Sequence, residues 1–341
     1  MVGSRTTTKT WPIIGHASQV DRLRRMVTGD QFPLAILITG APDVGRKALS
    51  LQFAAASLCP SASDGVPCGQ CRTCASVATE RHPDAEIWSV KRQEDESGAA
   101  SRSGSMTIET VRKIAASTAL RPYEGRHRFI IVDEAETLGE PAQQALLKTL
   151  EDLPGYATII LIATSAGAML DTVRSRCVEI ALQLVPTAEI VAAIDGPDAH
   201  AIAARAAGCP GWAIKALAEP DWRASQSEGI ERLESWLRMS TAERLVEAYQ
   251  RGDRFMKERK QAFQDLDRVQ LIWRDIVLTS ADLDQFAFDA ERARGLMARS
   301  SAGMSDWYRA LTATRQCIQD LTGNIRPRLA MQAMVNQWPT L

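Results

Sequence analysis

Hydrophobic positions in the first half of the chain alternate between two kinds of spacing. Apolar or mainly apolar runs predict strands at residues 34–39, 85–90, 129–132, 158–163 and 178–182. Apolar residues at spacings of three and four predict amphipathic helices at residues 18–27, 46–58, 107–119 and 141–153. Buried strands that alternate with helices indicate an α/β domain whose parallel sheet is covered on both faces.

The second half of the chain has helical patterns throughout, and no heptad persists long enough to predict a coiled coil. We expect three domains, at residues 1–182, 183–220 and 221–341. Polar composition predicts loose segments at residues 1–10 and 91–105. Large aromatic residues at helical spacing usually pack inside their own domain, so we expect core rather than interface positions for Trp222, Trp236, Trp273, Trp307 and Trp338.

Charge and composition exclude some classes of protein. The chain has 341 residues and a net charge of −1, so it has no overall attraction to nucleic acid or to a membrane surface. No apolar run is long enough to cross a membrane, and the first residues lack the apolar core of a secretory signal. Clustered cysteines indicate metal in a reducing compartment rather than a disulfide framework, so we expect a cytoplasmic protein.

Four cysteines lie close together in the sequence: Cys59, Cys68, Cys71 and Cys74. Thiolates at this spacing suit tetrahedral zinc, and four sulfur ligands leave no open position for catalysis, so we expect a structural zinc site. The alternatives are four reduced cysteines without metal and a redox CxxC pair. His82 is a possible further ligand, although a histidine that holds a turn is the preferred interpretation.

Residues 34–47 read as an altered phosphate-binding loop. Gly40 and Gly45 hold the two glycine positions of G-x-x-x-x-G-K-[ST], between an apolar run and a helical pattern. Arg46 stands at the lysine position, and Lys47 stands at the hydroxyl position. The forked guanidinium of arginine does not reproduce a compact ammonium, and lysine cannot ligate Mg²⁺. We therefore interpret this segment as a loop that keeps its fold and has lost its chemistry.

A second nucleotide-site signature follows about 90 residues after the glycine loop. The apolar residues 129–132 end in Asp133 and Glu134, the arrangement in which the aspartate supports magnesium and the glutamate polarises the attacking water. The alternative is a strand that ends in two solvated acids. Both acids are present, so weak binding of ATP and magnesium remains open at a site made of Gly40, Gly45, Arg46, Lys47, Asp133 and Glu134.

The order of motifs resembles a known family. It runs from the glycine loop through the cysteine knuckle (59–74) and the Asp-Glu strand to an ALLKTLE helix (145–151) and Ser175-Arg176-Cys177. This order is similar to the AAA+ clamp-loader subunits of bacterial DNA polymerase III over residues 11–215. A Gly-Asn-x-Arg segment (323–326) adds to the likeness. The resemblance implies a RecA-like AAA+ domain, a small helical lid, and a C-terminal helical domain that joins a pentameric collar.

The resemblance also implies a role for Arg176. In this family it would be an arginine finger, donated in trans to ATP on a neighbouring subunit; the alternative is an ordinary surface or salt-bridged arginine. Motor subunits (tau/gamma) and non-hydrolysing delta-prime subunits both carry this segment. The changes at Arg46 and Lys47, together with Pro210-Gly211 where motor subunits are expected to have a sensor arginine, favour the non-hydrolysing kind.

The resemblance finally implies partners. These are the tau/gamma motor and delta subunits of a hetero-pentamer and, through the complex, the sliding clamp and primed DNA, with no membrane contact. We expect no ATPase activity from the chain alone, although the holoenzyme is a DNA-directed DNA polymerase. One alternative is a motor-type ATPase in which Arg46 contacts the phosphates and Asp133 holds magnesium. Another is a zinc-dependent nucleic-acid-binding module, which the near-neutral charge disfavours.

Overall fold

The computed structural model describes residues 10–98, 104–322 and 325–341. Contacts divide the chain into an α/β unit, which ends at Asp195 and includes Gly208–Trp212, and a helical unit made of Gly196–Ala207 and Ala213–Leu341. The division into three domains at residues 182 and 220 stays a prediction. The loose segment expected at residues 1–10 lies outside the described residues, apart from Thr10.

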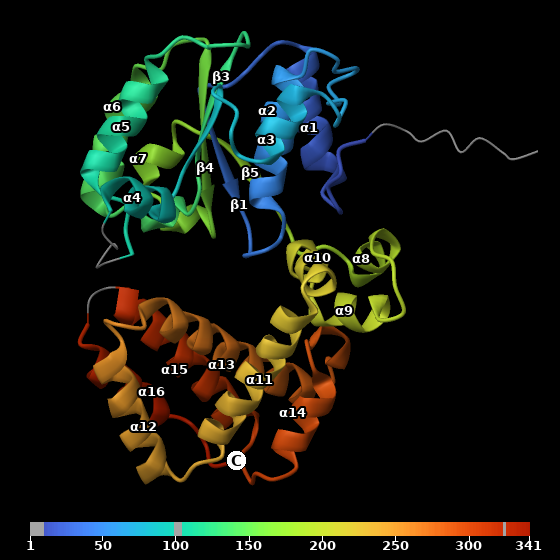
Figure 1. Ribbon diagram of the computed structural model, residues 1–341. Coiled ribbons are helices and arrows are strands. Elements are labelled where there is room, and N and C mark those ends of the chain that lie inside the picture. Colours follow the sequence, from blue (N-terminus) through green and yellow to red (C-terminus); the bar gives the residue numbers. More distant parts are fainter. Residues whose placement is uncertain (1–9, 99–103, 323–324) are drawn as a thin grey trace, which may run out of the picture. The chain divides into compact units, whose positions relative to one another are not determined.

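The α/β unit is built on a parallel sheet with the strand order β2-β3-β4-β1-β5 (Figure 1). β1 pairs with β4 and β5, so it is covered on both edges, and all of its residues are buried. Each predicted strand is confirmed to within two residues at either end, and the bounds are β1 Ala35–Thr39, β2 Ala85–Trp88, β3 Arg128–Val132, β4 Ala157–Ala163 and β5 Val178–Ala181.

Helices cover both faces of this sheet. Ile36 and Ile38 pack with α1, α2 and α3 on one face, while Leu37 packs with α5, α6 and α7 on the other (Figure 1). This alternation follows from the two-residue period of a strand. The helices of the unit are α1 Ala17–Thr28, α2 Arg46–Leu58, α3 Arg72–Ala78, α4 Val90–Ser97, α5 Ile108–Thr118, α6 Glu140–Glu151, α7 Asp171–Arg174 and α8 Thr187–Ala193, with short 3-10 turns at Ala135–Thr137 and Ala166–Ala168.

The expected loop at residues 91–105 is wrong for its first part, because α4 occupies Val90–Ser97. The hydroxyl of Ser89 accepts a hydrogen bond from the backbone N–H of Arg92 and so caps this helix. The guanidinium of Arg92 pairs with Glu86 and Glu96 and lies 3.8 Å from the ring centroid of Trp88. Polar side chains that pair with one another therefore support a helix that has no buried residue of its own. Residues 99–103 lie outside the described part of the chain.

The helical unit contains the second core. Four of the five tryptophans are buried there, and the rings of Trp236 and Trp338 meet edge to face with centroids 4.9 Å apart. This confirms the core prediction for all but Trp222, which is half-buried under the ammonium of Lys215. The remaining helices are α9 Ala199–Arg205, α10 Pro210–Ala218, α11 Pro220–Leu237, α12 Thr241–Arg254, α13 Arg259–Ser280, α14 Ala290–Met297, α15 Met304–Thr322 and α16 Pro327–Val335, with a 3-10 turn at Asp284–Phe286.

Across the described residues, every helix is too short or too polar to cross a lipid bilayer.

Candidate functional site

The glycine loop connects the carboxyl end of β1 to the first turn of α2, as the sequence predicts. Gly40 and Gly45 have φ of 151° and 113°, values that side chains rarely allow. A Cβ atom on Gly40 would also lie 2.8 Å from the backbone oxygen of Leu182. The carbonyl of Val44 accepts a hydrogen bond from Nε2 of His16 at 3.1 Å. The loop therefore has the backbone shape of a phosphate cradle, and the hydrogen bond from His16 holds it in place.

Lys47 lies in the first turn of α2 and is paired with acids. Its Nζ lies 2.8 Å from Oε1 of Glu80 and 3.5 Å from Oδ2 of Asp133, which follows β3. Burial lowers the pKa of Lys47, but the hydrogen bond that Lys47 donates to Glu80 and the charge of Asp133 outweigh this effect and raise the pKa overall. Lys47 is thus a fixed cation at the position whose hydroxyl would bind magnesium. Glu80 is a member of this cluster that the sequence analysis missed.

Arg46 is arranged differently from Lys47. Its side chain is half-buried, and Nη1 is buried without a hydrogen-bond partner among the described residues. The backbone N–H of Glu134 donates to Oδ1 of Asp133 at 3.0 Å, and Glu134 adopts a left-handed conformation with φ of 55°. The structure therefore brings Lys47 and Asp133 together.

The start of α10 packs against the loop. The backbone N–H of Gly211 donates to the carbonyl oxygen of Asp43 at 2.8 Å, and Asp43 itself has a positive φ of 57°. A Cβ atom on Gly211 would lie 2.8 Å from that same oxygen. The Pro210-Gly211 pair thus allows a close backbone contact at the place where motor subunits are expected to carry an arginine. The sequence pattern showed the substitution but not this contact.

The four cysteines converge as predicted. Their sulfur atoms all lie within 4.8 Å of one another, with 3.8 Å between Cys59 and Cys71 and 4.0 Å between Cys68 and Cys74. Tetrahedral zinc with Zn–S bonds of about 2.3 Å requires sulfur atoms about 3.8 Å apart, so the residues present fit this metal. Backbone N–H groups of Gln70 and Cys71 lower the pKa of Cys68 to about 6, whereas burial raises the pKa of Cys59 and Cys74.

His82 holds a turn, in agreement with the preferred interpretation. Its Nδ1 accepts a hydrogen bond from the backbone N–H of Asp84 at 3.0 Å, and its Nε2 lies 3.7 Å from a carboxylate oxygen of Glu124. The candidate metal group found in the described residues is made of the four cysteines, and His82 is not part of it.

Arg176 lies between α7 and β5, and its side chain is 38% exposed. Its Nη1 donates to the carbonyl oxygen of Thr172 at 2.8 Å, and its Nη2 donates to Oε1 of Glu151 at 2.5 Å. The guanidinium of Arg176 is thus partly exposed and bound to groups of α6 and α7.

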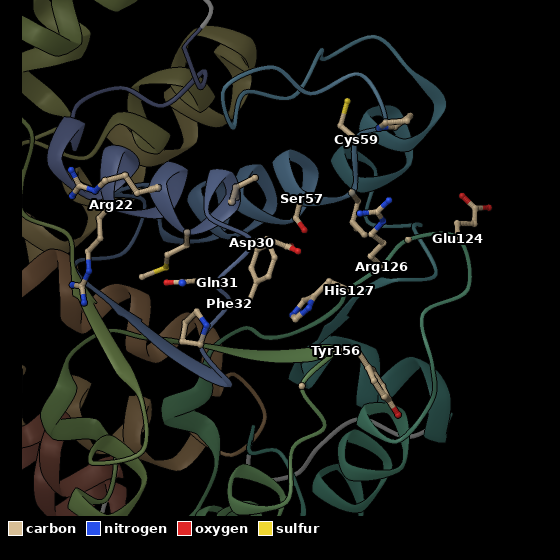
Figure 2. Close-up of a pocket in the computed structure, with 18 residues that line it drawn as sticks. Arg22, Asp30, Gln31, Phe32, Ser57, Cys59, Glu124, Arg126, His127 and Tyr156 are labelled. Carbon is tan, nitrogen blue, oxygen red and sulfur yellow. The ribbon is translucent and has the colours of Figure 1, made fainter.

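A groove of about 1600 Å³ lies at the amino ends of β1, β3 and β4, whereas the glycine loop follows the carboxyl end of β1 (Figure 2). His127 lines it, with the ring of Phe32 4.4 Å away between centroids and a 2.8 Å hydrogen bond from Nε2 to the hydroxyl of Thr158. Burial lowers the pKa of His127 to about 4, opposed by the charge of Asp30, so the imidazole is neutral near pH 7. Apart from Cys59, no predicted site residue lines this groove in the described chain.

Comparison with known proteins identifies relatives of this chain. A family described as DNA polymerase III, delta subunit, matches residues 15–186. The delta-prime subunit of DNA polymerase III from Pseudomonas aeruginosa is 28% identical over 154 residues, which are 45% of this chain and 44% of the relative. The delta-prime subunit of Haemophilus influenzae is 31% identical over 143 residues, 42% of this chain and 40% of the relative. The tau/gamma subunit of Haemophilus influenzae is 26% identical over 178 residues, 52% of this chain and 24% of the relative.

The aligned region spans less than half the length of each of these relatives. Residues 15–186, which the family matches, contain the glycine loop, the cysteine knuckle and β3 with Asp133 after it, all of which belong to the α/β unit. The parallel sheet followed by helices agrees with the fold class expected from the sequence. Because the family model covers half of its residues, the chain belongs to the DNA polymerase III delta-subunit family of clamp-loader proteins and is related to the tau/gamma subunits.

Proposed function

We propose that this chain is a non-hydrolysing clamp-loader subunit of the delta-prime kind, which supplies Arg176 to ATP bound by a neighbouring subunit. In this role it helps a complex of tau/gamma and delta subunits to load the sliding clamp onto primed DNA. The observation that carries the proposal is the ion pair between Lys47 and Asp133 inside the chain's own nucleotide site.

Electrostatics opposes magnesium binding at that site. A Walker-type site holds the metal between the hydroxyl at the position of Lys47 and the carboxylate at the position of Asp133. Here an ammonium lies 3.5 Å from that carboxylate, and it both neutralises the charge of Asp133 and repels a second cation. The second acid, Glu80, binds the same ammonium at 2.8 Å and keeps it in place.

The lid contact weakens the site further. Gly211 offers no positive charge to a γ-phosphate, and its close approach to Asp43 leaves little room for a longer side chain there. Two separate contributions to phosphate binding, the lysine of the loop and an arginine of the lid, are therefore absent from the described residues that form this site. Loss of both supports a subunit that does not hydrolyse ATP.

The position of Arg176 supports the second half of the proposal. An arginine finger has to be accessible to another subunit, and Arg176 is partly exposed on the α/β unit.

The zinc site has a structural role in this proposal. Its four sulfur ligands leave no open coordination position, and they connect the end of α2 to α3.

Two measurements test the proposal. The purified chain is expected to show no magnesium-dependent ATPase activity. In the complex reconstituted with tau/gamma and delta subunits, Arg176→Ala is expected to lower ATPase activity, because the adjacent site loses a contact to the γ-phosphate. Arg174→Ala is a matched control, since Arg174 is also partly exposed and pairs with Asp171 on the same segment. Steady ATP turnover by the chain alone, or unchanged activity of the Arg176→Ala complex, would contradict the proposal.

The second candidate function is a motor-type ATPase, and the presence of both Asp133 and Glu134 favours it. In that case Arg46, whose Nη1 has no partner in the described structure, would bind the phosphates directly. Equilibrium binding of ATP to the purified chain with and without Mg²⁺ separates the two functions. Tight binding that depends on the metal would support the motor-type alternative.

A further inference from the structure

The carboxylate of Glu151 contacts Arg176 and would compete with a phosphate group for its guanidinium. Glu151 is the last residue of α6, and its Oε1 accepts a hydrogen bond from Nη2 of Arg176. The carbonyl oxygen of Thr172 accepts from Nη1 at 2.8 Å. Carboxylate and carbonyl oxygens thus accept from two of the five N–H donors of the guanidinium.

The sign of the effect of Glu151 follows from charge. A carboxylate in contact with a guanidinium balances most of its positive charge, and a phosphate that approached the intact pair would meet repulsion as well as attraction. Glu151 therefore opposes phosphate binding as long as the pair persists. The carbonyl group of Thr172 is uncharged, so it orients Arg176 without opposing phosphate binding.

The strength of the pair is limited by exposure. The side chains of Arg176 and Glu151 are 38% and 53% exposed, so water screens their attraction. Pairs of this kind shift equilibria by roughly twofold to fivefold. A γ-phosphate carries more charge than a single carboxylate and can displace Glu151, whereas a neighbouring site that holds a nucleoside diphosphate offers no γ-phosphate to do so.

We propose that Glu151 is a specificity-determining counter-ion of Arg176, which holds the guanidinium until the γ-phosphate of a nucleotide on the neighbouring subunit displaces it. This inference rests on the proposed finger role of Arg176 and assigns it a competitor within its own chain. Glu151 sets the concentration of nucleoside triphosphate at which the finger engages, and it keeps the finger withdrawn from a diphosphate.

The test is Glu151→Gln in the reconstituted complex, because glutamine keeps an acceptor oxygen and removes the charge. The ATP concentration that gives half-maximal ATPase activity is expected to fall roughly twofold to fivefold, while the maximal rate changes less than twofold. Asp171→Asn is the matched control, since it removes one carboxylate from the neighbouring helix α7 and breaks the pair with Arg174 instead. The control is expected to leave both kinetic parameters unchanged.

The double variant Glu151→Gln/Arg176→Ala separates the inference from the proposed function. If Glu151 acts through Arg176, the glutamine has no further effect once Arg176 is alanine. An effect that persists in the double variant, or a half-maximal ATP concentration that stays the same or rises in Glu151→Gln, would overturn the inference and leave the finger role intact. If Arg176→Ala alone leaves the ATPase activity unchanged, the finger role itself fails.

Discussion

The ammonium of Lys47 and the carboxylate of Asp133 form an ion pair across the nucleotide site, with 3.5 Å between Nζ and Oδ2. One partner comes from the first turn of α2, and the other follows β3. In a working site the corresponding positions would hold magnesium between them. In the proposed non-hydrolysing role, the ammonium of Lys47 occupies the place of that metal ion.

This relationship predicts a gain of function. The double variant Arg46→Lys/Lys47→Thr restores the loop lysine and the metal-binding hydroxyl, and it frees Asp133 from its internal partner. We expect magnesium-dependent ATP binding to strengthen by roughly tenfold for each charge-assisted contact regained, as measured by equilibrium titration with a fluorescent ATP analogue. Lys257→Thr, at an exposed position in the helical unit, is the control for loss of a lysine. Binding that stayed as weak as in the unchanged chain would argue against Lys47 as the obstacle.

Removal of two metal ligands tests the zinc centre. Elemental analysis is expected to find one zinc ion per unchanged chain, at the four-cysteine group, and none in Cys71→Ser/Cys74→Ser. Because the metal ties the end of α2 to α3, its loss should destabilise the α/β unit by several kcal/mol, on the order expected for a structural metal. Cys209→Ser, outside this group, should keep the zinc. Zinc retained by the double variant would show that the metal lies elsewhere.

The contact between Gly211 and Asp43 predicts a steric effect. A methyl group on residue 211 would lie 2.8 Å from the backbone oxygen of Asp43, and neither backbone can move without disturbing the loop. We expect Gly211→Ala to lower the free energy of unfolding of the α/β unit by about 1–3 kcal/mol. A Cβ atom on Gly167 meets nothing within 4 Å, so Gly167→Ala is expected to cost less than about 0.5 kcal/mol in the same denaturation experiment. Equal losses in the two variants would refute the close contact.

The burial of His127 predicts a dependence of stability on pH. Its pKa falls from 6.5 to about 4 on folding, so the unfolded chain binds the proton more tightly than the folded chain. The contribution of neutral His127 is fully present above pH 6.5 and is lost as the pH falls toward 4, by about 3 kcal/mol in total. Urea unfolding of His127→Gln should show a smaller loss of stability between these pH values than the unchanged chain. The exposed His200→Gln variant should show the same pH dependence as the unchanged chain.

Local patterns were sufficient to predict most elements of the fold. A strand that is buried on both faces has to be apolar along its whole length, and β1, β3 and β4 are apolar enough to identify on this basis. The start of α2 was predictable because the two glycines of the loop permit backbone angles that other residues avoid. Helix α4 was not predictable from the sequence. Its stability depends on the pair between Arg92 and Glu86, which approach each other only when the helix lies beside β2.

The sequence by itself determined which chemical groups the protein has: four thiolates at zinc-binding spacing, a glycine loop with Arg46 and Lys47 in place of the usual lysine and hydroxyl, and an arginine before the last strand. Only the tertiary structure decided which groups face one another. In the folded chain Lys47 forms ion pairs with Asp133 and Glu80. Gly211 donates a backbone hydrogen bond to Asp43, and the guanidinium of Arg176 donates a hydrogen bond to Glu151. The physical reason is that charge and steric effects act through distance in space, and residues far apart in the chain come together only when the sheet and its covering helices form.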